Sequence, residues 1–320
     1  MVNPRGARRK HFVRRENYGR MPGMTYRPVH TPRVLRIPFR SLEHAVYIWG
    51  AESAPAIYLL HGFADTAMSF QFLADSLADR WRVIAPDLQG FGATGWSPRG
   101  YWFPDYFADL DALLNAFSPE EPVRLAGHSM GGNIATHYAG ILPERVTLLV
   151  SIDSFGLRET GPEQAPERFA EWLRQWRTRP EFNLYEDVSS YADIIRERAP
   201  HIPADRAAYL APYWGKRTGS GKWTSRVDPN HKRVNPMLYR RAEARACWRR
   251  IRAQVLLILG GESKTWARYY QEGGRSDFQP WFSGLQEATI PGAGHMIHLD
   301  QPELLARTLD DFFSRSGIPL

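Results

Sequence analysis

Short apolar runs alternate with helical patterns along most of the chain. The apolar runs have the composition of strands and lie at residues 33–39, 44–49, 56–62, 81–87, 123–127, 146–152, 253–260 and 285–290. Between several of these runs, apolar residues recur at helical spacing, at about 67–80, 107–117, 131–141 and 302–313. Parallel strands that are covered on both faces read as apolar runs joined by helices. The pattern therefore predicts an α/β domain with a mostly parallel, eight-stranded sheet and helices on both faces.

The alternation stops between residues 154 and 250. This segment is helical in pattern, rich in Trp and Tyr, and divided by several prolines. Its Gly- and Ser-containing stretch at 216–226 predicts a loop. We therefore expect a helical lid at 154–250, inserted between the sixth and seventh strands of a core domain formed by residues 33–153 and 251–320.

Positive charge is concentrated at the N-terminus. Residues 1–40 hold eleven of the 41 Lys and Arg residues and one of the 34 acidic residues, a net charge of +10, whereas the rest of the chain carries −3. We expect residues 1–32 to form a basic, disordered and solvated tail. Such a tail could make weak contacts with anionic surfaces or act as a targeting sequence. No nucleic acid partner is expected for the mildly acidic core.

Cysteine content and hydropathy narrow the class of protein further. The one cysteine, Cys247, excludes an internal disulfide framework. No apolar run has the 18 or more residues of a membrane span, and the N-terminus lacks the apolar core of a secretory signal. We expect a cytoplasmic monomer or homodimer that needs no metal and no other cofactor.

The strongest chemical motif is a G-x-S-x-G pattern at residues 127–131, between a predicted strand and a predicted helix. In this context the turn is so tight that the serine must adopt a strained backbone, which exposes its hydroxyl. Gly127 and Gly131 are needed because a Cβ would collide with the adjacent strand and helix. The N-terminus of the helix favours negative charge at the serine. Ser129 is therefore the candidate nucleophile.

Several motifs, in this order, resemble those of the α/β-hydrolase family. They are His61-Gly62-Phe63, APDLQGFGATG at 85–95, GHSMGG at 127–132 and PGAGHMIHLDQPE at 291–303. The resemblance extends from about residue 33 to the C-terminus. It implies the α/β-hydrolase fold, with a serine, a histidine and an acid acting together at one end of the sheet.

The resemblance also implies the base and the oxyanion donors. The family's base is a histidine in the loop after the last strand, and His295 fits this position, with His298 as a weaker candidate. His128 adjoins the serine, but adjacent side chains in such a turn point in different directions, so we exclude it. Acyl transfer needs donors aimed at the developing oxyanion. We expect the backbone N–H groups of Phe63 and Met130 to supply them.

The acid is harder to assign. Family members commonly carry it after the seventh strand in a G-x-x-D pattern, but LLILGGES places Ser263 there, and a serine cannot stabilise imidazolium by charge. Asp153, at the end of the sixth strand, is the preferred acid because the ends of neighbouring parallel strands share one rim. Some haloalkane dehalogenases of the family are similar in placing their acid there. Glu262 and Asp277 are the alternatives.

A serine nucleophile argues against dehalogenase and epoxide-hydrolase chemistry, because those relatives use an aspartate. We expect a serine hydrolase that cleaves a carboxylic ester or thioester. The aromatic lid, together with His61, Tyr101 and Trp102, predicts a pocket for an apolar acyl or aryl group. A C–C bond hydrolase and a cofactor-free haloperoxidase-like enzyme remain open. The presence of Ser129 and His295 argues against a non-catalytic binding module.

Overall fold

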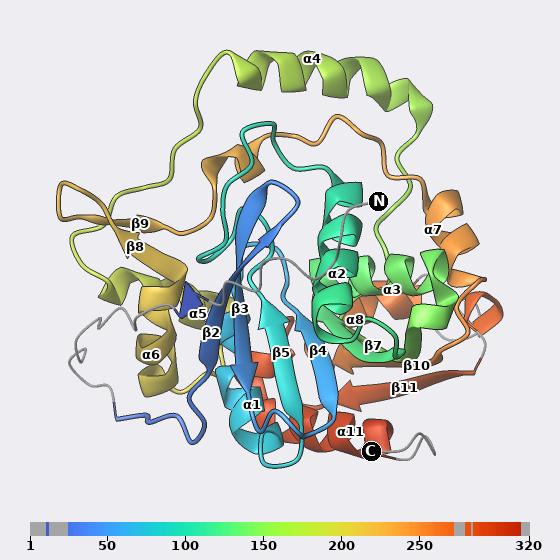
Figure 1. Cartoon of the computed structure of the whole chain (residues 1–320). Coiled ribbons are helices and arrows are strands. Elements are labelled where there is room, and N and C mark those ends of the chain that lie inside the picture. Colours follow the sequence, from blue (N-terminus) through green and yellow to red (C-terminus); the bar gives the residue numbers. More distant parts are fainter. Residues whose placement is uncertain (1–10, 13–24, 272–278, 283, 315–320) are drawn as a thin grey trace.

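A nine-stranded sheet forms the centre of the computed structural model, which describes residues 11–12, 25–271, 279–282 and 284–314 (Figure 1). In spatial order the strands are β1 (His11–Phe12), β2 (Arg33–Phe39), β3 (Leu42–Trp49), β5 (Arg82–Pro86), β4 (Ala56–Leu60), β6 (Val123–His128), β7 (Val146–Ile152), β10 (Gln254–Gly260) and β11 (Leu285–Ile290). The pairings from β1 to β5 are antiparallel and the others are parallel. The eight predicted strands are confirmed, and β1 is a two-residue addition at the edge.

Helices cover both faces of the sheet, as the sequence predicted (Figure 1). One face packs against α1 (Gln71–Leu77) and α11 (Pro302–Ser314), and the other against α2 (Phe103–Phe117), α3 (Met130–Ile141) and α7 (Arg241–Trp248). Alternate strand residues enter the two cores: Ile57 and Leu59 join the first, Tyr58 and Leu60 the second. Because both of their faces are buried, the central strands β4, β7 and β10 are mostly apolar. Shorter elements are η1 (Ala67–Phe70), η2 (Pro143–Arg145), α8 (Lys264–Gln271), η5 (Gln279–Trp281) and α10 (Ile297–Asp300).

Residues 154–250 form an insertion between β7 and β10. Its elements are η3 (Pro162–Gln164), α4 (Ala165–Trp176), α5 (Ser189–Arg198), α6 (Ala204–Trp214), β8 (Gly215–Arg217), β9 (Trp223–Ser225), η4 (Pro229–Lys232) and α7. Helices α5 and α6 extend the first core through Ile195 and Leu210, whereas α4 crosses the top of the molecule and has no buried residue (Figure 1). The stretch 216–226, expected to be a loop, contains the hairpin of β8 and β9, because Gly221 supplies the positive φ of 86° that its turn requires.

The packed part of the chain begins before residue 33, where the tail was expected to end. Tyr26 lies edge-on to Phe72 and Tyr209, with ring centroids 4.9 Å away in both cases, and its hydroxyl donates a hydrogen bond to Asp75. An aromatic side chain can thus anchor a segment whose charge pattern indicated solvation. None of the helices in the described part of the chain is long and apolar enough to span a membrane.

The contact of α3 with α7 depends on Gly140. A Cβ added at this position would lie 2.1 Å from the carbonyl oxygen of Cys247, which belongs to the backbone and cannot rotate away. We expect Gly140→Ala to lower the free energy of unfolding by about 1–3 kcal/mol, measured by urea denaturation, despite the helix preference of alanine. The control is Gly219→Ala, where a Cβ meets no atom within 4 Å. Equal stabilities of the two variants would contradict this packing.

Candidate active site

Ser129 lies at the turn from β6 into α3. Its backbone has φ 51° and ψ −114°, a conformation that is strained for any residue except glycine and costs about 1–3 kcal/mol. The flanking glycines permit the turn. A Cβ at Gly127 would lie 2.2 Å from the carbonyl oxygen of Gly131, and one at Gly131 would lie 2.3 Å from the carbonyl oxygen of Leu60. The tight turn predicted from the sequence is therefore present.

His295 lies in the loop after β11, within hydrogen-bond distance of two predicted site residues. Its Nε2 is 3.0 Å from Ser129 Oγ, and its Nδ1 is 2.6 Å from Asp153 Oδ2. Because a carboxylate only accepts hydrogen bonds, the ring proton belongs on Nδ1. The unprotonated Nε2 can then accept the hydroxyl proton of Ser129.

Asp153 directly follows β7, and its side chain is completely buried. Its φ of 49° is in the left-handed region, which aspartate tolerates better than most residues. The backbone N–H of Gly260 donates to Oδ1 at 3.1 Å, and Ser263 Oγ donates to Oδ2 at 2.5 Å. These donors and His295 compensate for the burial of the charged group.

Ser263, at the position where the family commonly carries its acid, lies beside Asp153, which follows the neighbouring strand β7. Ser263 donates to Asp153 and accepts a hydrogen bond from the N–H of Thr265 at 3.0 Å. The alternative Glu262 points away from this cluster, and its carboxylate lies 2.8 Å from His201 Nε2 on the exposed surface. The other alternative, Asp277, lies outside the described residues.

The loop after β4 places Phe63 beside Ser129, and His61 orients it. The N–H of Leu88 donates to His61 Nε2 at 2.9 Å, so Nδ1 carries the proton and donates to the carbonyl oxygen of Gly62 at 2.8 Å. That carbonyl and the Phe63 N–H belong to one planar peptide group, so fixing one fixes the other. His61, expected in the pocket, lies fully buried beneath the loop instead.

A cavity of about 350 Å³ opens above Ser129. Phe63 and Met130 line it together with Tyr101 and Trp102, which the sequence placed there, and Trp172 and Trp176 of α4 close one side. His231, a lining residue that sequence reasoning missed, stacks on Tyr101 with ring centroids 3.7 Å apart. Burial lowers the pKa of His231 to about 4, so its ring is neutral at pH 7. The sequence of the insertion gave no signal for His231, because the position of His231 depends on the path of the insertion.

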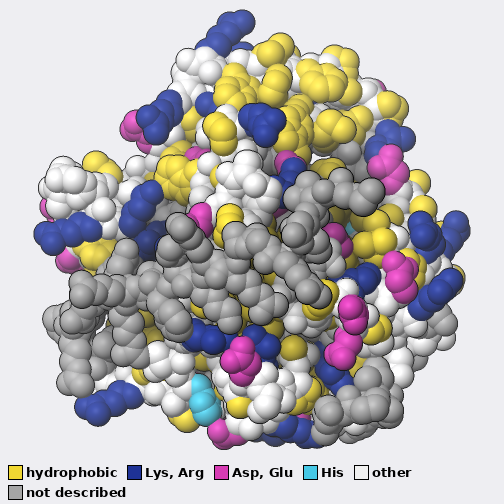
Figure 2. Space-filling view, viewed as in Figure 1, with side chains coloured by type: hydrophobic (Ala, Val, Ile, Leu, Met, Phe, Trp, Pro, Cys, Tyr) yellow, Lys and Arg dark blue, Asp and Glu magenta, His cyan; other side chains and the backbone are white. Residues whose placement is uncertain are grey.

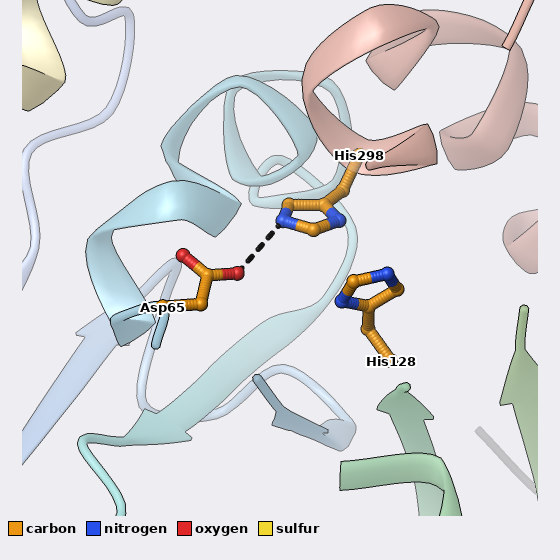
Figure 3. A group of neighbouring side chains, drawn as sticks. All are labelled: Asp65, His128 and His298. Atoms are coloured by element: carbon orange, nitrogen blue, oxygen red, sulfur yellow. Dashed lines mark hydrogen bonds and ion pairs between the residues drawn. The ribbon is translucent and has the colours of Figure 1, made fainter. Parts of the chain in front are cut away.

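The two other histidines near Ser129 belong to a buried cluster with Asp65 (Figure 3). His128 Nε2 donates to the carbonyl oxygen of His295 at 2.7 Å, and burial lowers the pKa of His128 well below its usual value. His298 Nε2 lies 3.2 Å from Asp65 Oδ2. Neither ring contacts Ser129 by a hydrogen bond in the structure, which agrees with the preference for His295.

The same cluster has the composition of a metal site. One ligand atom from each of Asp65, His128 and His298 lies within 4.8 Å of the others. However, the Asp65 carboxylate already accepts hydrogen bonds from the Thr66 N–H, the Ser69 hydroxyl and His298. A metal would have to displace part of this set, so we interpret the cluster as a hydrogen-bonded link between loops.

A mostly parallel sheet with a serine at a strained strand–helix turn defines the α/β-hydrolase class. The chain matches the family model described as the alpha/beta hydrolase fold over residues 55–302, and it belongs to that family.

Two relatives of this chain have hydrolase names. It is 24% identical over 289 residues to a serine hydrolase-like protein of Danio rerio, a match that covers 87% of each chain. It is 25% identical over 270 residues to the 2-(acetamidomethylene)succinate hydrolase of Mesorhizobium japonicum, covering 81% of this chain and 88% of that protein. A thioesterase domain from the curacin biosynthetic pathway shares the fold, with a TM-score of 0.77, 21% identity, and coverage of 88% of this chain and 99% of that one.

Asp153→Asn removes the negative charge facing His295 and keeps the size of the side chain. If Asp153 is the acid, kcat for an ester substrate falls about 10²–10⁴-fold. The matched Glu262→Gln stays within about fivefold of wild type, because an exposed ion pair contributes at most about 1 kcal/mol. A loss in Glu262→Gln without a loss in Asp153→Asn would assign the acid to Glu262.

Adding Ser263→Asp to Asp153→Asn returns a carboxylate to the place where a hydroxyl now lies 2.5 Å from Asp153 Oδ2. We expect the double variant to be about tenfold or more faster than Asp153→Asn alone, because a charge again faces the imidazole. A double variant no faster than Asp153→Asn would show that position 263 cannot serve the histidine in this chain.

Proposed function

We propose that this protein is a serine hydrolase that cleaves the ester or thioester bond of an apolar acyl or aryl substrate through an acyl-Ser129 intermediate. The observation that carries the proposal is the continuous hydrogen-bond chain from Ser129 Oγ through His295 to the buried Asp153. A weak nucleophile needs such a base, and the base needs an orienting partner. The hydrolase names of the relatives add support.

The residues act in two half-reactions. His295 Nε2 takes the hydroxyl proton as Ser129 Oγ attacks the carbonyl carbon, and the oxyanion accepts hydrogen bonds from the N–H groups of Phe63 and Met130. Asp153 stabilises the imidazolium that forms. The intermediate then expels the alcohol or thiol, which receives the proton from His295. Water, deprotonated by the same imidazole, attacks the acyl-serine, and the acid is released with Ser129 restored.

The walls of the cavity favour an apolar group. Most of its lining is aromatic or aliphatic. Apolar side chains also gather on the surface beside it, over and around α4 (Figure 2). The exposed apolar residues of α4 are Phe169, Leu173 and Trp176, and the exposed Leu157 lines the cavity. An acyl or aryl group bound in the cavity would exchange water for these apolar walls, which supports the substrate class. We propose that the insertion acts as the lid of this cavity.

Fluorophosphonate labelling tests the nucleophile directly. We expect wild type to gain the mass of one phosphonyl group and to lose activity on p-nitrophenyl esters in parallel. Ser129→Ala should show neither labelling nor ester turnover, because the attacking hydroxyl is gone. Ser220→Ala, an exposed serine in the β8–β9 turn, is the control and should label like wild type. Labelling of Ser129→Ala would contradict the proposal. Turnover of a dienoic acid chromophore without ester turnover would instead favour C–C bond hydrolysis.

A series of p-nitrophenyl esters from C2 to C12 tests the pocket. Trp176 lines the cavity, whereas Phe169 on the same helix is exposed and does not. We expect Trp176→Ala to lower kcat/KM for the longer esters about tenfold, mainly through KM, because about two methylene groups lose an apolar partner. Phe169→Ala should change these values little. Equal effects of the two substitutions would place the acyl group elsewhere.

A further inference from the structure

We infer that Arg198, the last residue of α5, is a positioning residue for the oxyanion hole, an inference that rests on the proposed function. Its Nη1 donates to the carbonyl oxygen of Ala64 at 2.5 Å, and its Nη2 donates to that of Phe63 at 3.1 Å. These carbonyls belong to the loop whose Phe63 N–H we propose as an oxyanion donor. The insertion thus holds the backbone of this loop from 134 residues away in sequence.

The loop after β4 contains a strained residue, so its conformation depends on contacts with its surroundings. Ala64 has φ 53°, a left-handed conformation that costs a residue other than glycine about 1–3 kcal/mol. His61 fixes the peptide group before Phe63, through the carbonyl of Gly62. Arg198 fixes the two carbonyls that follow. With both sides held, the Phe63 N–H keeps one direction while charge develops on the substrate oxygen, which is the condition for oxyanion stabilisation.

The side chain of Arg198 packs against another helix of the insertion. Its guanidinium lies 4.8 Å from the ring centroid of Trp214, at the end of α6. The indole N–H of Trp214 donates to Ser69 Oγ at 3.0 Å, and Ser69 donates to Asp65, which follows Ala64 in the loop. Helix α5 therefore bonds to this loop directly, and α6 bonds to it through Ser69 of η1. Any movement that separates α5 and α6 from the core breaks these bonds together.

The contacts also reach the loop that carries His295. Asp65 bonds to His298, which lies three residues after His295, and Figure 3 shows their side chains facing each other. Burial alone would raise the pKa of Asp65. The hydrogen bond from His298 and the positive charge of Arg198 outweigh burial and hold the pKa of Asp65 well below its usual value. The buried anion thus ties the insertion, the oxyanion loop and the histidine loop together.

Arg198→Met removes the charge, the hydrogen bonds to the Phe63 and Ala64 carbonyls and a long contact with Met296 Sδ, and keeps an apolar stem on Trp214. On an ester substrate, we expect kcat to fall about 10- to 100-fold, with KM within about threefold of wild type, because the donor is misplaced and the pocket is intact. Arg198→Lys keeps the charge but lacks the two-pronged guanidinium that reaches both carbonyls. Its kcat should lie between those of wild type and Arg198→Met. The control is Arg196→Met on the same helix, where Arg196 lies 4.0 Å from the exposed Asp193. It should behave like wild type.

A trifluoromethyl ketone separates positioning from a merely structural role, because its hemiketal with Ser129 carries an oxyanion. Its affinity should fall with kcat/KM in Arg198→Met, while the affinity of the corresponding alcohol, which forms no oxyanion, is unchanged. A wild-type kcat, or equal losses for ketone and alcohol, would overturn the inference. Urea denaturation checks that the variant is folded. Trp214→Phe, which removes the indole N–H together with the five-membered ring and leaves a smaller aromatic face for Arg198, provides a milder variant with the same expected pattern.

The experiments on Arg198 and the experiments on the proposed function have independent outcomes. Fluorophosphonate labelling of wild-type Ser129 examines the nucleophile alone and does not depend on Arg198. If Arg198→Met kept the wild-type kcat and ketone affinity while wild type still labelled at Ser129, the proposed function would stand and the role of Arg198 would be excluded.

Discussion

The buried carboxylate of Asp153 is the constraint on which the rest of the candidate site depends. It accepts hydrogen bonds from three elements: the end of β10 through Gly260, the following turn through Ser263, and the β11 loop through His295. A buried carboxylate has no water to solvate it, so it needs hydrogen-bond donors from the protein. Each group that donates to it is thereby held in position. The charge that orients the imidazole therefore also holds together the ends of the strands around it.

A second constraint is stored strain. Ser129, Asp153 and Ala64 all have positive φ values; Ser129 directly follows β6, Asp153 directly follows β7, and Ala64 lies in the loop after β4. Such conformations persist where the surrounding packing determines them, here through the glycines of the Ser129 turn and the hydrogen bonds of Asp153. In the loop after β4, the corresponding support comes from Arg198, in the insertion. Contacts within the core therefore fix Ser129 and Asp153, whereas a contact from the insertion fixes the loop after β4.

The sequence predicted what depends on local pattern. Apolar runs located the sheet, the G-x-S-x-G pattern located Ser129, and the shared rim of parallel strands favoured Asp153 over Glu262. It could not predict that Ser263 would donate to Asp153, because that bond joins two strand ends through their exact separation. Nor could it place Arg198 or His231, whose partners are set by how the insertion packs. Tyr26 showed that charge density alone does not define where packing begins.

The protonation of His295 tests the central claim most directly. In protein labelled with ¹⁵N-histidine, NMR distinguishes a protonated Nδ1 from an unprotonated one. We predict that neutral His295 carries its proton on Nδ1, in a strongly deshielded hydrogen bond that persists in Ser129→Ala and is lost or shifted upfield in Asp153→Asn. A neutral His295 with its proton on Nε2, or a spectrum indifferent to Asp153→Asn, would contradict a histidine held by Asp153 to accept the proton of Ser129.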